Sequence, residues 1–174
     1  MSDDKVILVD KNDNQVGLMP KLEAHEKGLL HRAFSVFIFN NEYKLLLQKR
    51  ATSKYHSGGL WTNTCCSHPR EGEDISEAAN RRLFEEMGIK TSLRKVYDFI
   101  YKAELDNGLT ENEFDHVFYG VYDKEPKINL EEADDYKWMD MDSLNDDINN
   151  NGGNYTVWFK IAFEYFYNYL KKWK

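Results

Sequence analysis

Residues 67–89, SHPREGEDISEAANRRLFEEMGI, are the stretch of this chain from which the fold can be read. Asp74 and Glu77 have the form of a capping box, which satisfies free backbone N–H groups at the start of a helix. Gly88 suits the left-handed conformation in which helices commonly end. Between these signals, apolar side chains recur at the spacing of one helical face: Ala78, Ala79, Leu83 and Met87. The sequence therefore predicts an amphipathic helix between Asp74 and Gly88.

Strand-like runs precede and follow this helix. Residues 31–40 (HRAFSVFIFN) and 43–50 (YKLLLQKR) are predicted to pair as a hairpin that turns at 40–42. A short helix with proline in its first turn is predicted at 20–27. Further strands are predicted at 5–10, 92–102, 111–122 and 136–140, with Asp106-Asn107-Gly108 as the turn between the second and third of them.

The last part of the chain is predicted to be a helix at 155–173. One helical face carries Phe159, Phe163, Phe166 and Leu170, so this helix is expected to pack on the sheet. Residues 149–153, NNNGG, are expected to form a flexible loop, and the acidic residues within 129–147 a solvated face. Strands and helices in this order indicate an α/β sandwich with a mixed sheet.

Length and composition favour a single soluble domain spanning residues 1–174. The net charge of −7 argues against binding to nucleic acid, where Lys and Arg neutralise phosphates. No run approaches the roughly 20 apolar residues of a membrane span, and residues 1–5 lack the features of a signal peptide. We therefore expect a cytoplasmic protein with a small-molecule partner, and the sequence leaves monomer and homodimer both open.

Several residues have the chemistry of a metal site. Glu111 and Glu113 are two apart on a predicted strand, so their carboxylates leave one face, although alternating acids on a solvated face would look the same. His25, His31 and His68 lie near predicted element ends, and imidazole with carboxylate suits Zn, Mn or Fe. Taken singly, each histidine is more typical of a surface or hydrogen-bonded structural residue than of a metal ligand.

The two cysteines, Cys65 and Cys66, are adjacent, which excludes an ordinary disulfide between them because their Cα atoms are only about 3.8 Å apart. On a strand their side chains would point to opposite faces. A zinc finger is excluded because no second cysteine pair exists.

The region around the predicted helix resembles the Nudix box, G-x5-E-x7-R-E-U-x-E-E-x-G-U, where U is aliphatic. The matching positions are Glu73, Arg81, Leu83, Glu85, Glu86, Gly88 and Ile89. Two positions depart from it, because Ser67 replaces the first Gly and Arg82 replaces the Glu of the Arg-Glu pair. The resemblance implies a Nudix-type α/β/α sandwich with a mixed sheet and extra N- and C-terminal elements.

Residues 61–69, WTNTCCSHP, carry a more specific resemblance. With the step Cys66-x-His68 they are similar to the type 1 isopentenyl-diphosphate isomerases, Nudix relatives that move a double bond and do not hydrolyse. This resemblance spans about Lys5 to about Lys171. It implies interconversion of isopentenyl and dimethylallyl diphosphate, with Cys66 and Glu113 as the acid/base pair.

The same resemblance implies roles for other residues. It implies one tightly bound divalent metal (Zn, Mn, Fe or Mg) on His25, His31, His68, Glu111 and Glu113. It implies that Glu86 binds Mg²⁺ together with the substrate diphosphate, which Lys21, Arg50, Lys54 and Arg82 contact. Tyr101 and Trp158 are expected to act at the carbocation and Trp61 to wall the pocket. From spacing alone, Arg82 with Glu86 could equally be an i,i+4 surface pair.

Three other functions compete with this interpretation. The first is a Nudix hydrolase of nucleoside diphosphate derivatives. Hydrolysis would give Cys66 and His68 no role, and the acidic residue that the Nudix box has at the position of Arg82 is absent. A catalytically silent binding module is the second alternative. The flavin-dependent isomerase of the same substrate is excluded by length, since its barrel needs roughly 250 residues.

Overall fold

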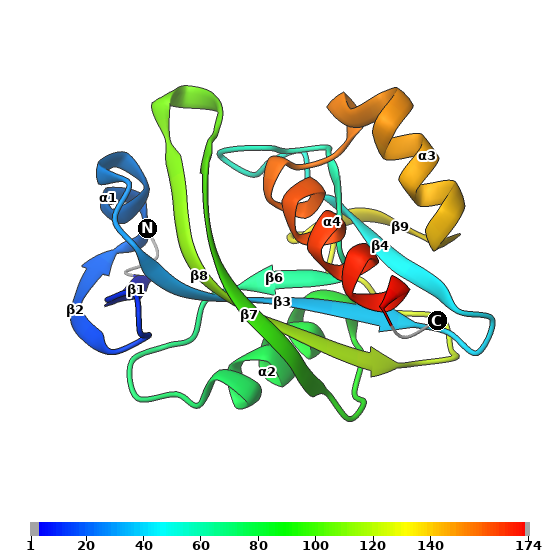
Figure 1. Ribbon diagram of the computed structural model, residues 1–174, viewed down its shortest axis with the longest axis horizontal. Helices are drawn as coiled ribbons and strands as arrows, with labels where there is room; N and C mark the ends of the chain where they lie inside the picture. The colour runs from blue at the N-terminus through cyan, green and yellow to red at the C-terminus, as the bar shows by residue number, and fades with distance from the viewer. Residues whose placement is uncertain (1–3, 173–174) are drawn as a thin grey trace.

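The computed structural model describes residues 4–172 and shows a sheet with helices on both faces (Figure 1). The expectations for residues 1–3 and for the end of the last helix at Trp173 lie outside the described residues. The helices are α1 (Lys21–Lys27), α2 (Ile75–Met87), α3 (Met141–Asn151) and α4 (Val157–Lys171), with short 3₁₀ turns at Asp106–Gly108 and Gly152–Asn154. The strands are β1 (Lys5–Val9), β2 (Gln15–Pro20), β3 (His31–Phe39), β4 (Lys44–Arg50), β5 (Trp61–Thr62), β6 (Cys65–Ser67), β7 (Arg94–Glu104), β8 (Thr110–Val121) and β9 (Ala133–Asp140).

The nine strands form one mixed sheet around β3. β3 runs parallel to β8 along its whole length and antiparallel to β6 on its other side. β7 extends the sheet beyond β8, and β9 pairs with β4. The α/β architecture with a mixed sheet is therefore confirmed, and the parallel pairing sets β3 and β8 side by side at the centre.

The predicted hairpin of β3 and β4 is wrong over most of its length, because the two strands pair only at Phe39 and Leu45. They diverge beyond that pair, and the hydroxyl of Thr64 bridges the gap. Its Oγ1 accepts from the backbone N–H of Ile38 at 3.0 Å and donates to the carbonyl of Leu46 at 2.7 Å. The opening makes room for β6, which pairs with β3 and carries Cys66.

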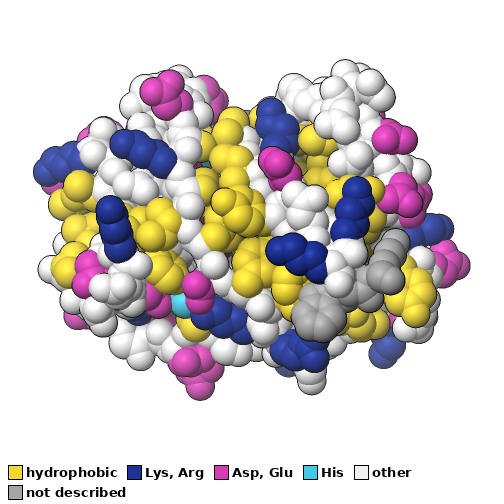
Figure 2. Space-filling model, in the orientation of Figure 1, with side chains coloured by type: hydrophobic (Ala, Val, Ile, Leu, Met, Phe, Trp, Pro, Cys, Tyr) yellow, Lys and Arg dark blue, Asp and Glu magenta, His cyan; other side chains and the backbone are white. Residues whose placement is uncertain are grey.

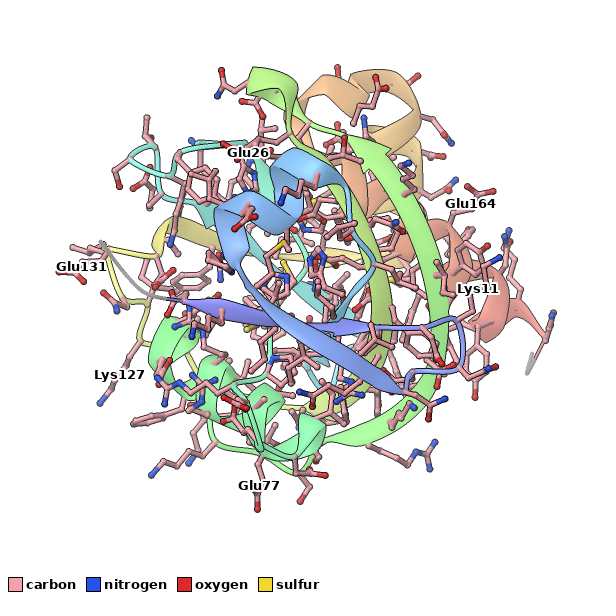
Figure 3. The ribbon with its side chains drawn as sticks, turned by 90° about the vertical axis from the view of Figure 1, so that its left-hand side faces the viewer. Lys11, Glu26, Glu77, Lys127, Glu131 and Glu164 are labelled. Carbon is pink, nitrogen blue, oxygen red and sulfur yellow. The ribbon has the colours of Figure 1, made fainter. Side chains whose placement is uncertain are left out.

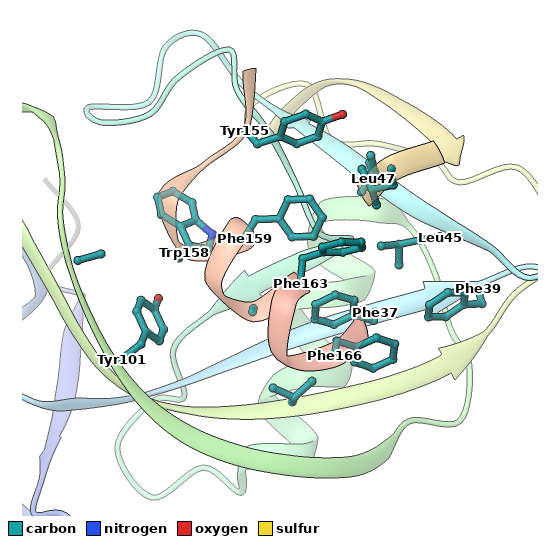
Figure 4. Packing of buried hydrophobic residues seen from close by; sticks show 14 residues of the cluster. Phe37, Phe39, Leu45, Leu47, Tyr101, Tyr155, Trp158, Phe159, Phe163 and Phe166 are labelled. Carbon is teal, nitrogen blue, oxygen red and sulfur yellow. The ribbon is translucent and has the colours of Figure 1, made fainter. Parts of the chain in front are cut away.

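Alternating residues of β3 face the two helix layers, as a strand requires. Phe34, Val36 and Ile38 pack against α2, within a buried cluster that includes Leu83 and Met87. On the other face, the ring of Phe37 stacks on Phe166 of α4 at a centroid distance of 4.5 Å. Figure 4 shows Trp158 at the end of this second cluster that lies nearest Tyr101. The buried cluster around Phe37 therefore includes two of the expected site residues, Tyr101 and Trp158.

The predicted helix around residues 74–88 is confirmed as α2. The side chain of Asp74 accepts from the backbone N–H groups of Ser76 and Glu77, and Gly88 ends the helix with φ +66°.

Figure 2 shows basic and acidic side chains interspersed on the opposite face of the molecule, the one that α4 covers. No helix within residues 4–172 combines the length and apolarity that crossing a membrane requires.

α3 was not predicted, and the flexible loop expected at 149–153 is wrong. Residues 149–151 end α3, and 152–154 form a 3₁₀ turn. Met141, Leu144 and Ile148 lie at helical spacing on one face of α3, and this face packs against the buried cluster beside α4. Local polar bonds add to this packing: the side chain of Asp140 caps Ser143 N at 2.9 Å, and Asn151 donates to Asp147 at 2.7 Å.

Gly88 gives a test of how α2 is held. A Cβ added there would lie 2.7 Å from the backbone oxygen of Lys127. We expect Gly88→Ala to lower the free energy of unfolding by about 3 kcal/mol, because left-handed strain and a backbone clash combine. Gly72→Ala is the control: φ there is +74° but nothing lies within 4 Å, so about 1 kcal/mol is expected. If urea denaturation gave the same loss of unfolding free energy for Gly88→Ala and Gly72→Ala, the clash at Gly88 would not contribute.

Candidate active site

Two glutamates on β8 point to one face of the sheet and are buried. Glu111 and Glu113 are 5% and 6% exposed. The hydroxyl of Tyr101, on the neighbouring β7, lies 2.6 Å from Glu111 Oε2 and 2.7 Å from Glu113 Oε2. Burial and the charge of Glu113 raise the pKa of Glu111. Two carboxylates this close in a buried site are both ionised only when a positive charge compensates them.

Three histidines from separate parts of the chain surround these carboxylates. His25 lies on α1, His31 begins β3 and His68 follows β6. One ligand atom from each imidazole and one from Glu113 all lie within 4.8 Å of one another. Glu111 adjoins the group, with its Oε1 3.4 Å from His25 Nε2. The structure therefore brings together the five residues expected to hold the tightly bound metal.

The imidazoles of His25 and His31 are oriented as metal ligands. Nδ1 of each lies 2.8 Å from a backbone carbonyl, that of Lys21 and that of Leu29, and donates to it in the neutral ring. Nε2 of each then faces the carboxylates as an acceptor, and both atoms are buried with no hydrogen-bond partner among the described residues. Such outer carbonyl bonds are usual for metal-bound histidines. The residues present therefore fit a divalent metal.

Within the protein alone, Glu113 favours positive charge on His31. Burial lowers the pKa of His31, but Glu113 outweighs it and raises that pKa overall. Burial likewise would raise the pKa of Glu113, but His31 and His68 hold it well below the usual range. The cluster therefore keeps Glu113 ionised, which a metal ligand and a proton acceptor both require.

A cavity of about 40 Å³ lies beside the cluster. Its lining is Lys21, Arg50, His56, Cys66, Ser67, His68, Glu111, Glu113 and Trp158. Cys66 and Glu113 therefore face the same space. The indole N–H of Trp158 donates to Cys66 Sγ at 3.2 Å, and the guanidinium of Arg50 lies 5.0 Å from the Trp158 ring.

The two cysteines point to opposite faces, as expected. Cys65 is fully buried in the cluster around α2, whereas Cys66 lines the cavity. Burial raises the pKa of the Cys66 thiol to about 12. The thiol is therefore protonated at neutral pH and can donate a proton to a substrate in the cavity.

Of the expected diphosphate contacts, Lys21 and Arg50 line the cavity, whereas Lys54 and Arg82 do not. Lys54 pairs with Glu132, and Arg82 pairs with Glu132 at 3.2 Å. The two cations are thus joined through one carboxylate. They belong to a polar network beside the cavity.

Glu86 and Trp61 also lie outside the cavity lining. Glu86 is buried, with Oε1 2.6 Å from the guanidinium of Arg82 and Oε2 accepting from Gln48 at 2.9 Å. The i,i+4 pair between Arg82 and Glu86 is therefore real but not a surface pair. Trp61 packs against the α4 cluster, with the Lys137 ammonium 4.3 Å from its ring.

His56 is a cavity residue that sequence reasoning missed. It is buried although the residues on either side of it are exposed or half-buried, and its ring meets that of Trp158 edge-on at 5.6 Å. Burial and the nearby Arg50 and Lys21 lower its pKa to about 3, so its imidazole is neutral. A lone histidine in a loop gives no periodic signal. The loop is held in place by its own bonds, since the Arg50 guanidinium donates to the backbone oxygen of His56 at 3.3 Å and Thr52 N donates to Asp134 at 2.9 Å.

Comparison with known proteins begins with the fold. Residues 29–159 match the model of the NUDIX domain. A crystal structure from Deinococcus radiodurans superposes with a TM-score of 0.71 at 19% identity, covering 85% of this chain and 90% of that one. A MutT protein from Methanosarcina mazei superposes with a TM-score of 0.67, also at 19% identity, covering 82% and 96%. These structures share the fold.

Curated relatives are much more similar in sequence. An isopentenyl-diphosphate Delta-isomerase 2 from Photorhabdus laumondii is 58% identical over 158 residues, covering 91% of this chain and 89% of that protein. An enzyme of the same name from Aromatoleum aromaticum is 51% identical over 162 residues, covering 93% and 86%. The chain therefore belongs to the NUDIX family and, within it, to the isopentenyl-diphosphate Delta-isomerases.

Proposed function

We propose that this protein interconverts isopentenyl diphosphate and dimethylallyl diphosphate, as a metal-dependent isomerase of the type 1, flavin-independent class. The name and 58% identity of the Photorhabdus relative support the reaction. One observation supports the mechanism: Cys66, a protonated thiol, and Glu113, a buried carboxylate, line the same small cavity.

The reaction needs two acid/base groups around an alkene. One group protonates the double bond to form a tertiary carbocation, and the other removes a proton from the neighbouring carbon. We assign these tasks to Cys66 and Glu113, which exchange roles when the reaction reverses. Tyr101 supports the pair, because its hydroxyl contacts Glu113 and holds that carboxylate in place.

Trp158 is placed to stabilise the carbocation. Its indole reaches the cavity next to the Cys66 thiol, and an aromatic face stabilises a desolvated cation by about 2 kcal/mol. The Trp158 indole, the Cys66 thiol and Glu113 therefore border the same cavity, where the alkene of the substrate would lie.

Metal ions have two places in this proposal. His25, His31, His68, Glu111 and Glu113 would hold the tightly bound divalent ion, whose charge keeps the buried carboxylates ionised. Glu86 would bind Mg²⁺ that arrives with the diphosphate, after exchanging its bond to Arg82. Lys21 and Arg50 on the cavity wall, with Lys54 and Arg82 beside it, would bind the diphosphate oxygens.

Proton NMR tests the reaction directly. Isopentenyl diphosphate incubated with the protein and Mg²⁺ in D₂O is expected to convert to deuterated dimethylallyl diphosphate, because solvent protons enter through the acid/base pair. Release of inorganic phosphate or pyrophosphate from nucleoside diphosphate derivatives, with no isomerisation, would instead favour the hydrolase alternative. Folded, metal-loaded protein is required in both assays.

A further inference from the structure

Glu132, which immediately precedes β9, joins two cations that the proposed mechanism assigns to the substrate. Its Oε2 contacts the Lys54 ammonium, and its Oε1 lies 3.2 Å from the Arg82 guanidinium. All three side chains are only 20–25% exposed. Each oxygen of one carboxylate therefore serves a different cation, in a place largely shielded from water.

This bridge adjoins the cavity. The backbone oxygen of Glu132 accepts from Ala51 N at 3.0 Å, and Ala51 follows Arg50 of the cavity wall. Burial, Arg50 and Lys54 together lower the pKa of Lys21, which places the Lys54 charge within electrostatic range of the cavity. An anion bound at Lys21 and Arg50 thus lies beside the cations that Glu132 holds.

A carboxylate and a phosphate bind these cations in the same way. Both present oxygens in a geometry that the arginine fork matches, and both accept from a lysine ammonium. Arg82 also pairs with Glu85 at 2.8 Å and Glu86 at 2.6 Å, but Glu132 is the one carboxylate paired with both Lys54 and Arg82 among the described residues. A diphosphate that bridges these two cations therefore competes with the Glu132 oxygens. The displaced carboxylate stays nearby as a negative charge that repels the newly bound anion.

We propose that Glu132 is a built-in substitute for a substrate phosphate: it holds Lys54 and Arg82 ready when the site is empty of substrate and competes with the diphosphate for them. The inference rests on the proposed function in assigning those two cations to the diphosphate. Glu132 thereby weakens the binding of substrate and product alike. It helps the product diphosphate to leave.

Isothermal titration of the metal-loaded protein with inorganic pyrophosphate and Mg²⁺ tests this. Glu132→Gln is expected to bind pyrophosphate about five- to tenfold more tightly, because the competing charge is removed. Glu131→Gln is the matched control, since it removes the same charge from an exposed neighbour that projects outwards (Figure 3) and should leave the affinity unchanged. Glu132→Asp keeps the charge but shortens the reach across both cations, so an intermediate gain is expected.

Lys54→Met separates failure of this inference from failure of the proposed site. If Lys54→Met weakens pyrophosphate binding while Glu132→Gln leaves it unchanged or weaker, Glu132 is not a competitor and the inference falls alone. If neither variant changes the affinity, the assignment of the diphosphate site falls with it. Equal gains in Glu131→Gln and Glu132→Gln would show a general charge effect and overturn the inference. Circular dichroism confirms that each variant is folded.

Discussion

Replacing Cys66 by alanine is expected to lower kcat for isomerisation by about 10³-fold or more, because general acid/base groups contribute on the order of 10²–10⁴ and no other thiol faces the cavity among the described residues. The protein should stay folded, since Cys66 belongs to the cavity wall and only adjoins the α4 cluster. Initial rates of conversion of isopentenyl diphosphate, with thermal unfolding recorded for the same preparation, measure both effects.

Cys65→Ala is the matched control for that loss. Cys65 is its neighbour in the chain but lies fully buried on the other side of β6, against α2. We expect it to keep most of the activity and to lose about 1 kcal/mol of stability from the small cavity left behind. If Cys66→Ala turned over normally, or if Cys65→Ala lost the activity instead, the proposed acid/base pair would be wrong even with the fold unchanged.

Glu113→Gln is expected to have two large effects. The side chain keeps its shape but loses the charge that His31 and His68 surround and the ability to exchange a proton. Isomerisation, and with it the incorporation of deuterium from D₂O into dimethylallyl diphosphate, should fall by about 10²–10⁴-fold. The tightly bound metal should also be lost or weakened by about 10–100-fold, the size of effect seen when support for a metal site is removed. Elemental analysis of the purified variant measures the metal.

Glu104→Gln is the control for the general effect of removing a carboxylate near this hairpin. Glu104 is exposed at the end of β7, away from the cavity lining, so neither activity nor metal content should change. Full metal content in Glu113→Gln would remove this carboxylate from the proposed metal site. Continued deuterium incorporation would remove it from the acid/base pair.

The sequence predicted those elements whose signals are local. The cap at Asp74, the apolar face of α2 and the stop at Gly88 are all written within a few residues, and the helix formed as expected. The alternation of Glu111 and Glu113 likewise placed both carboxylates on one face. α3 was not predicted although Met141, Leu144 and Ile148 lie at helical spacing and Asp140 is a helix cap, because the many Asp and Asn residues around them also fit a solvated face and a loop.

The pairing of β3 and β4 depends on residues that come later in the chain. Nothing in residues 31–50 shows that β3 and β4 part after one pair, because the Thr64 hydroxyl that spans them and the β6 strand that enters between them come later in the chain. Without that opening, Cys66 would have no place beside β3. The resemblance in residues 61–69 pointed to the thiol, but not to the reason why it reaches the cavity.

By itself, therefore, the sequence determined the type of most elements, the faces of α2 and β8, and the chemical identity of the groups at the site. Only the tertiary structure decided that His25, His31, His68 and Glu113 converge and that His56 joins Trp158 at the cavity. It also decided that Glu132 holds Lys54 and Arg82. The physical reason is range: caps and periodicities act between residues a few positions apart, whereas a buried charge cluster forms where packing of distant strands excludes water and leaves polar atoms only one another as partners.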